Sequence, residues 1–135
     1  MRTLLLMLTL LCSTQLFAHG TIIINNVKHS KGYIDVKIYD NKVSFLKEKL
    51  ATEIVRKKAT QGKTVVPLSK IHEGQIAIVV YHDEDGNGKM KTGLFWRPKE
   101  GFAFSNDYKP KGPPKFSKTA ITLIHGETVE IQLNY

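Results

Sequence analysis

Alternation of apolar and polar positions dominates the chain after residue 20 and predicts short β-strands. Residues 33–39 alternate cleanly, with three aliphatic residues on one face of the strand and Asp35 and Lys37 on the other. Residues 75–82 are almost all apolar, which is typical of a central strand with both faces covered. Further strands are predicted at 21–27, 52–59, 64–68, 119–125 and 128–135.

The connections between these strands complete the predicted fold. Residues 28–32 and the pair Gly126-Glu127 look like hairpin turns, and the closing strand would place Val129, Ile131 and Leu133 inward. Pro67 puts its strand at an edge or a strand end. Residues 43–50 predict at most one helical turn, too short to stand alone. We therefore expect one all-β domain, a single antiparallel β-sandwich of about seven strands, Ig-like or transthyretin-like, with one long ordered loop.

That loop runs for 36 residues, from 83 to 118, and is rich in aromatic side chains, glycine and proline. A disordered loop would carry fewer aromatic residues, so it is expected to fold back onto the sheets. Either the aromatic side chains cap an open end of the core, or they form part of a ligand groove over residues 83–116. The residues expected to bind such a ligand are His82, Trp96, Glu100, Phe104, Ser105 and Asn106.

The first 18 residues have the pattern of a secretory signal peptide. Arg2 is followed by an apolar run and a polar-to-small exit that ends at Ala18, where cleavage is expected. A lipoprotein signal at Cys12 is the alternative, but the preceding Leu11 is larger than the residue usual there. Removing 18 of the 135 residues leaves 117, without cysteine, as the β-sandwich domain 19–135. The prediction is a periplasmic or secreted protein with no membrane-spanning helix.

The charge of the chain is strongly basic, but it comes from lysine. Loss of Arg2 lowers the formal net charge from +8 to +7 and leaves only Arg56 and Arg97 as arginines. Nucleic-acid binding proteins favour arginine, so no nucleic-acid partner is expected. The lysines either keep the surface soluble or attract anionic lipids and acidic glycans. The two candidate basic patches are 56–58 and the group Lys109, Lys111, Lys115 and Lys118.

A turn that could hold a cation follows the central strand. Asp83, Asp85, Asn87 and Lys89 stand at alternate positions, with glycines between them, as in a calcium-binding loop. The second half departs from such a loop, because Lys91 and Leu94 occupy later ligand positions. The alternatives are a weak calcium site and a metal-free turn in which Asp and Asn accept local backbone N–H groups. A carboxylate from Glu100 or Asp107 would favour the metal.

His82 shares the strand phase of Ile76, Ile78 and Val80, so its side chain should point inward at the end of that strand. A histidine at such a position is either a hydrogen-bonded structural residue or a ligand at the rim of the sandwich. The pattern leaves both possibilities open.

Three ordered segments, HDEDGNGKM, RPKEGFAFSN and GPPKFSKTAITL, are followed by a closing VEIQLNY strand. Together they resemble the bacterial domain-of-unknown-function 2141 family over essentially the whole chain after the leader. The resemblance implies a small exported β-sandwich and no assigned activity. The family pattern falls on His82, Asp83, Asn87, Gly88, Pro98, Glu100, Gly101, Phe104, Ser105, Asn106, Gly112, Pro113, Pro114 and Phe116. Lys91 stands where relatives commonly have an acidic residue.

These observations favour a non-catalytic envelope domain that binds a small molecule, a glycan or an envelope protein, with or without calcium. Copper binding is an alternative, because cleavage would leave His19 as an N-terminal residue that His82 or His125 could join. A hydrolase is a further alternative. It would use Ser105 with His82 and Asp83, or Glu100 with Asp83 or Asp85.

Overall fold

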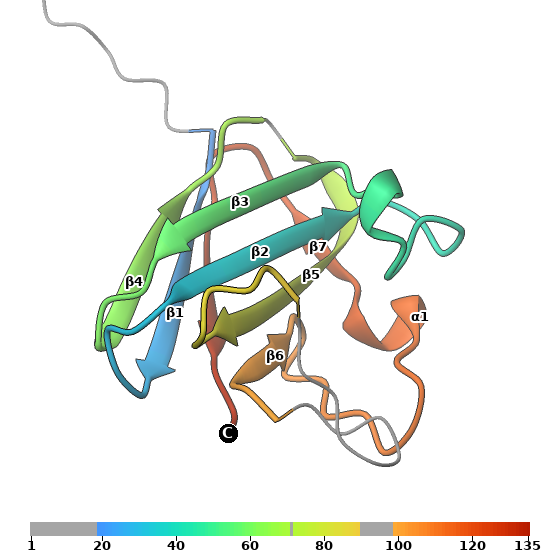
Figure 1. Cartoon of the computed structure of the whole chain (residues 1–135). Coiled ribbons are helices and arrows are strands. Elements are labelled where there is room, and N and C mark those ends of the chain that lie inside the picture. The colour runs from blue at the N-terminus through green and yellow to red at the C-terminus, as the bar shows by residue number, and fades with distance from the viewer. Residues whose placement is uncertain (1–18, 71, 90–98) are drawn as a thin grey trace, which may run out of the picture.

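The computed structural model describes residues 19–70, 72–89 and 99–135, and these form an all-β domain (Figure 1). In chain order the elements are β1 (Thr21–Val27), β2 (Tyr33–Tyr39), the 3-10 turn η1 (Glu48–Leu50), β3 (Glu53–Lys58), β4 (Gly62–Pro67), β5 (Gly74–Asp83), β6 (Phe102–Phe104), the one-turn helix α1 (Phe116–Thr119), β7 (Ile121–Leu123) and β8 (Thr128–Gln132). No helix among the described residues is long and apolar enough to cross a membrane.

The strands form two sheets. The smaller has the order β4-β1-β8, and the larger has the order β3-β2-β5-β6, with β7 pairing with the first residues of β5. Figure 1 shows β2 lying between β3 and β5 in the larger sheet. The β1–β8 pair is parallel, so the expectation of an entirely antiparallel fold is wrong at this pairing.

Both predicted hairpins are also wrong. β1 and β2 are consecutive but belong to different sheets, and so do β7 and β8. Instead, β7 pairs with β5, and β8 pairs with β1. A short connection fits a hairpin but equally fits a crossing between sheets, which buries the inward faces of both strands against each other. The pairing partner therefore does not follow from the connection length.

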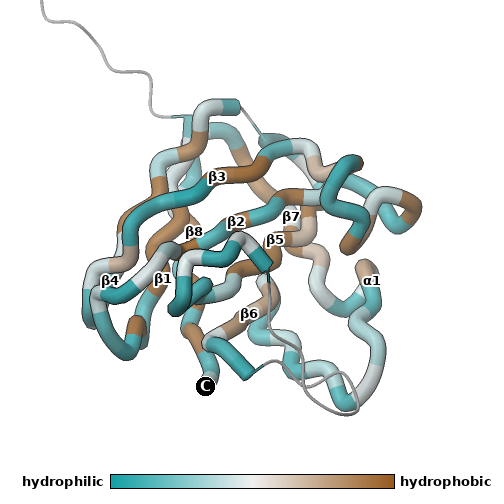
Figure 2. Tube along the Cα trace, viewed as in Figure 1, coloured by the Kyte–Doolittle hydropathy of each residue, from teal (hydrophilic) through white to brown (hydrophobic). Residues whose placement is uncertain are grey.

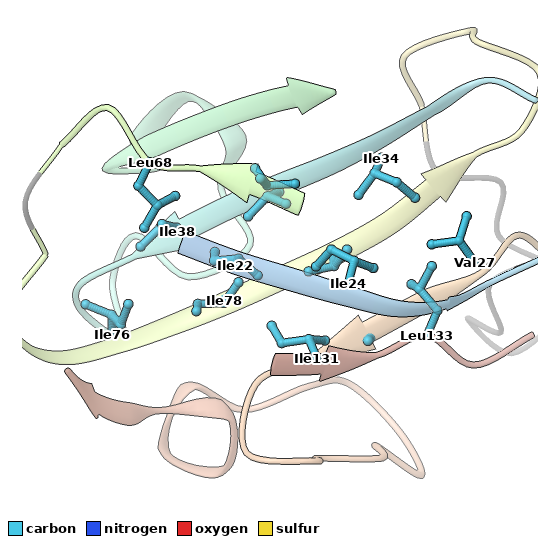
Figure 3. Close-up of a cluster of buried hydrophobic side chains, with 14 of the residues drawn as sticks. Ile22, Ile24, Val27, Ile34, Ile38, Leu68, Ile76, Ile78, Ile131 and Leu133 are labelled. Atoms are coloured by element: carbon cyan, nitrogen blue, oxygen red, sulfur yellow. The ribbon is translucent and has the colours of Figure 1, made fainter. Parts of the chain in front are cut away.

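The inward faces of both sheets share one hydrophobic cluster. Its members come from β1, β2, β4, β5, β6, β7 and β8 and from residues that flank the strands, and isoleucines from both sheets gather between the sheets (Figure 3). Ile34, Val36 and Ile38 are fully buried, which confirms the predicted inward face of β2. Ile131 and Leu133 are buried as expected. Burial of such side chains stabilises a fold by roughly 1.5–3 kcal/mol each.

A second cluster covers the outer face of the larger sheet. Tyr39, Ala77, Val79 and Phe104 are buried there, and Phe45, Ala51, Phe102, Tyr108 and Phe116 pack against them. The described part of the long segment therefore covers β5 on its second face, as its apolar pattern predicted. This segment is not purely a loop, because Phe102–Phe104 pairs with β5 as the strand β6.

A buried carboxylate closes the connection between β4 and β5. Glu53 Oε1 accepts hydrogen bonds from Ser69 N–H and O–H at 2.8 and 2.7 Å, and Oε2 accepts one from His72 Nε2 at 2.7 Å. Burial by itself raises the pKa of Glu53, but the hydrogen bonds from His72 and Ser69 outweigh it and lower that pKa below the ordinary 4.5. The sequence pattern did not indicate this contact.

Candidate functional site

The turn after β5 is organised by its own side-chain oxygens. Asp83 is buried, and its carboxylate accepts the N–H of Asn87 at 3.1 Å and that of Gly88 at 2.7 Å. Asp85 Oδ1 also accepts from Asn87 N–H at 3.2 Å, and Asn87 Oδ1 accepts from the N–H of the exposed Lys89 at 2.7 Å. Gly86 and Gly88 have φ of +70° and +75°, which favours glycine at both positions. These hydrogen bonds are the ones expected of a metal-free turn in which Asp and Asn accept local backbone N–H groups. They also hold several side-chain oxygens close together.

Glu100, which lies just before β6, comes close to this turn. Carboxylate oxygens of Asp83, Asp85 and Glu100 all lie within 4.8 Å of one another. Glu100 is buried, and its Oε1 accepts the N–H of Glu84 at 3.2 Å. The described residues hold one such group of three acids, and Asp107 is not part of it. Glu100 is therefore the additional carboxylate that would favour a metal at this turn.

Arg56 stands beside this acidic group and bridges two buried carboxylates. Nη2 donates to Asp83 Oδ2 at 2.7 Å, and Nη1 donates to Asp35 Oδ2 at 2.6 Å. The guanidinium also stacks over the Tyr33 ring, 4.2 Å from its centroid. Burial raises the pKa of Asp35 although Arg56 opposes this rise. The sequence grouped Arg56 with a basic surface patch; its side chain is 34% exposed, and its guanidinium reaches down to the two buried carboxylates.

The formal charges of the cluster define what it attracts. Three carboxylates and the Arg56 guanidinium sum to −2, which a divalent cation would neutralise. Asp83 Oδ2 accepts from both Gly88 N–H and Arg56 Nη2, so Asp83 would ligate a metal through Oδ1, which has a second lone pair beside its bond from Asn87 N–H. The Arg56 charge opposes the cation, which predicts weak binding.

His82 lies next to the turn but is fully enclosed by structural hydrogen bonds. Because a carbonyl only accepts, Nε2 donates to Lys31 O at 2.6 Å, and Nδ1 accepts from the Tyr135 hydroxyl at 2.8 Å. The Tyr135 oxygen in turn accepts from Lys28 N–H at 2.9 Å. The inward direction predicted for His82 is confirmed, and the structural alternative describes its contacts.

Tyr135 connects this network to the loop that carries Glu100. Its ring lies against Gly101, where an added Cβ would be 2.5 Å from the ring. Gly101 therefore leaves room for the Tyr135 ring at the residue that follows Glu100.

Three other predicted ligand residues lie elsewhere. Phe104 is buried in the outer cluster, and the buried Ser105 hydroxyl accepts from Ile78 N–H at 2.9 Å and donates to Thr119 O at 2.6 Å. Asn106 is exposed and donates to Lys118 O at 3.0 Å. Ser105 and Asn106 join the end of β6 to α1. Ser105 also contacts Ile78, which precedes Asp83 by five residues on β5. Trp96 lies outside the described residues.

Of the two catalytic combinations that the sequence offered for a hydrolase, the serine–histidine pair does not assemble among the described residues. The Ser105 hydroxyl is bonded to Ile78 and Thr119, whereas both His82 nitrogens are bonded to Lys31 and Tyr135, so no serine–histidine pair forms. The carboxylate combination does come together, because Glu100 lies near both Asp83 and Asp85. Asp83 is fully buried and bonded to Arg56, whereas Asp85 is exposed.

A groove opens on the outer face of the larger sheet beside the turn. It has a volume of about 430 Å³ and is lined by Asp35, Lys37, Glu48, Ile54, Arg56, Tyr81, Gly86, Asn87 and Gly88. Lys37 closes one part of it with an ion pair to Glu48 at 2.7 Å and lies over the Tyr81 ring at 5.1 Å. Its lining combines hydrogen-bond donors and acceptors, and its one aromatic residue, Tyr81, is only 2% exposed. The sequence did not indicate this groove, because its residues come from β2, β3, β5, η1 and the turn.

His19, the residue of the copper alternative, lies just before β1. Its Nδ1 atom is buried and has no hydrogen-bond partner among the described residues. His82 is next to Lys31, beyond the other end of β1, so the two histidines are separated by the length of that strand. His125 lies in the turn whose Glu127 carbonyl accepts from Thr21 N–H, so it is the nearer of the two proposed partners.

Fold and site together define a small all-β domain of two sheets, with an acidic turn joined by a glutamate from a long loop. The chain belongs to the bacterial family described as "Uncharacterized protein conserved in bacteria (DUF2141)", whose model matches residues 22–132. This confirms the resemblance found in the sequence. No curated protein and no solved structure matches the chain significantly.

Proposed function

We propose that this chain is an exported, non-catalytic β-sandwich domain, Ig-like or transthyretin-like, that binds calcium weakly at the acidic turn. The same face would bind a polar small molecule, a glycan or a segment of an envelope protein in the adjoining groove. The observation that carries the proposal is the approach of Glu100 to Asp83 and Asp85, within 4.8 Å.

Calcium is the ion that suits these ligands. It takes six to eight oxygens in flexible geometry, and carboxylates, backbone carbonyls and water can supply them here. Export supports this choice, because extracellular sites operate at dissociation constants on the order of 10⁻⁴ to 10⁻³ M. Bound calcium would connect the end of β5 to the segment that precedes β6 and so stiffen one wall of the groove.

The groove lining suggests the kind of ligand. Asp35, Lys37 and Arg56 line it, together with Gly86, Asn87 and Gly88 from the turn that carries the cation site. This combination of donors and acceptors matches the hydroxyl-rich surface of a glycan. A glycan titration followed by amide chemical shifts should move the signals of Gly86, Asn87 and Gly88 first.

A calcium titration tests the metal part. The chain should be purified from cells that express it with its own leader, and melted with and without calcium at about 10 mM. With a dissociation constant of about 1 mM, the ion would add about 1.4 kcal/mol of stability and raise Tm by about 5 °C. Calorimetry should detect the same binding.

Three variants locate the site. Glu100→Gln and Asp85→Asn should abolish the calcium-induced rise in Tm, and Asp107→Asn, a matched change on the same segment, should preserve it. No heat and no change in Tm at millimolar calcium would exclude calcium binding. An unchanged response of Glu100→Gln would show that the ion binds elsewhere.

A further inference from the structure

The segment between β2 and β3 exposes large apolar side chains at the edge of the molecule. It projects beyond the ends of the two strands (Figure 1), and Figure 2 shows hydrophobic stretches along it. Val43, Leu46 and Leu50 are 70%, 38% and 52% exposed. Large apolar side chains that are exposed close together commonly mark an interaction surface.

This segment is held in place by its own hydrogen bonds. Asn41 Oδ1 accepts from Ser44 N–H at 2.9 Å, and the Asn41 carbonyl accepts from Phe45 N–H at 3.2 Å. Lys47 N–H donates to Ser44 O at 2.9 Å. Phe45 points the other way and packs edge-on against Tyr39, with ring centroids 5.7 Å apart. The exposed residues are therefore presented in a fixed arrangement.

Leu46 occupies a backbone conformation that stability alone does not favour. Its φ is +63°, in the left-handed region where glycine is strain-free and a leucine is strained. Strain of this kind is commonly retained where a side chain serves an interaction. Here it holds a leucine on the projecting surface.

Exposed lysines lie close to these apolar side chains along the sequence. Residues 37–50 contain four lysines and two acids, and the pair between Lys37 and Glu48 leaves Lys42, Lys47 and Lys49 exposed around the tip. α1 adjoins the segment, because its Phe116 packs on Phe45 with ring centroids 5.9 Å apart. It contributes two more exposed lysines, Lys115 and Lys118.

We propose that the segment 40–50 is a membrane-surface anchor that binds anionic phospholipid bilayers. Val43, Leu46 and Leu50 enter the boundary between headgroups and acyl chains, and the flanking lysines contact the phosphates. The apolar side chains alone would also suit a protein partner, but the exposed Lys42, Lys47 and Lys49 favour an anionic lipid surface. The anchor uses none of the residues of the calcium site.

Vesicle sedimentation tests this anchor with the whole exported chain. Phosphatidylcholine vesicles that contain about 30% phosphatidylglycerol should bind the chain, and pure phosphatidylcholine vesicles should bind it far less. Raising NaCl from about 0.1 to about 0.5 M should weaken the binding, because the lysine contribution is screened. The double variant Val43→Ser/Leu50→Ser should bind about tenfold or more weakly.

Matched variants separate this segment from general surface properties. Val65 and Ile124 are comparably exposed elsewhere, at 49% and 73%, so Val65→Ser/Ile124→Ser should bind vesicles as the parent does. Leu46→Gly should raise Tm by relieving strain and at the same time weaken vesicle binding.

Three results would overturn the proposal. The first is no binding to anionic vesicles, and the second is equal binding by the two double variants. The third is a parent chain that binds no vesicles but forms a dimer, which Val43→Ser/Leu50→Ser loses.

Discussion

Replacing Arg56 with methionine should destabilise the domain much more than loss of a surface charge usually does. The guanidinium bridges Asp35 at 2.6 Å and Asp83 at 2.7 Å, and these carboxylate side chains are 5% and 0% exposed. Methionine keeps the apolar stem of the side chain but removes both charge-assisted hydrogen bonds. Two buried carboxylates would then lack their cation.

The magnitude follows from burial. Removing one partner of a buried ion pair costs about 3–5 kcal/mol. Arg56 is itself 34% exposed, so water screens part of the interaction, and Asp83 keeps its two bonds to backbone N–H groups. We therefore expect a loss of about 2–4 kcal/mol in the free energy of unfolding, or about 10 °C in Tm for a chain of this size.

Urea unfolding at pH 7, followed by circular dichroism, would measure this loss. Lys58→Met is the matched control, since it removes the same charge from an exposed position two residues along β3 and should change stability by less than about 0.5 kcal/mol. Adding Asp35→Asn to Arg56→Met should restore about half of the loss, because one orphaned charge disappears. Equal stability of Arg56→Met and Lys58→Met would refute the reasoning.

Three further changes should alter stability. The lowered pKa of Glu53 means that its contribution is complete above pH 4.5 and is lost as the pH falls through the lower folded-state value, so Glu53→Gln should flatten the pH dependence of the urea midpoint below pH 4.5. Ser105→Ala should cost about 1–3 kcal/mol, because the buried Ile78 N–H loses its acceptor. Tyr135→Phe should cost about 1–2 kcal/mol, because Nδ1 of the buried His82 loses its donor. Urea unfolding measures the last two.

Conservative controls accompany each change. Glu73→Gln, Ser117→Ala and Tyr33→Phe alter exposed residues of the same type and should leave stability nearly unchanged. An undiminished acid response in Glu53→Gln would assign that response to other carboxylates. Parent-like stability of Ser105→Ala or Tyr135→Phe would show that water replaces the lost hydroxyl.

Predictions that rested on one strand at a time agree with the structure. The inward residues of β2 and of β8, the covered central strand β5 and the inward His82 were all expected from alternation. Alternation reports which face of a strand is buried, because side-chain direction has a period of two residues in any β-strand.

Predictions of pairing were less successful. The expected hairpins are absent, β1 and β8 run parallel, and β6 lies inside what the sequence indicated to be a loop. Partner choice depends on how two sheets close over a common core, which is a property of many distant residues together.

The candidate site divides in the same way. The spacing of Asp83, Asp85 and Asn87 located a self-organised turn, and Glu100 was one of two acids whose approach to that turn would favour a metal. The structure alone decided that Glu100 and not Asp107 arrives there, and that Ser105 and Asn106 serve the α1 connection instead.

By itself, the sequence determined the all-β class, the buried faces and the oxygen-rich turn, because each depends on contacts or periodicities within a few residues. Only the tertiary structure decided the partners of Asp83, since Arg56 is 27 residues away along the chain and Glu100 is separated by the whole turn and its following segment. Charge interactions act through space, so the electrostatic character of this site was set by folding.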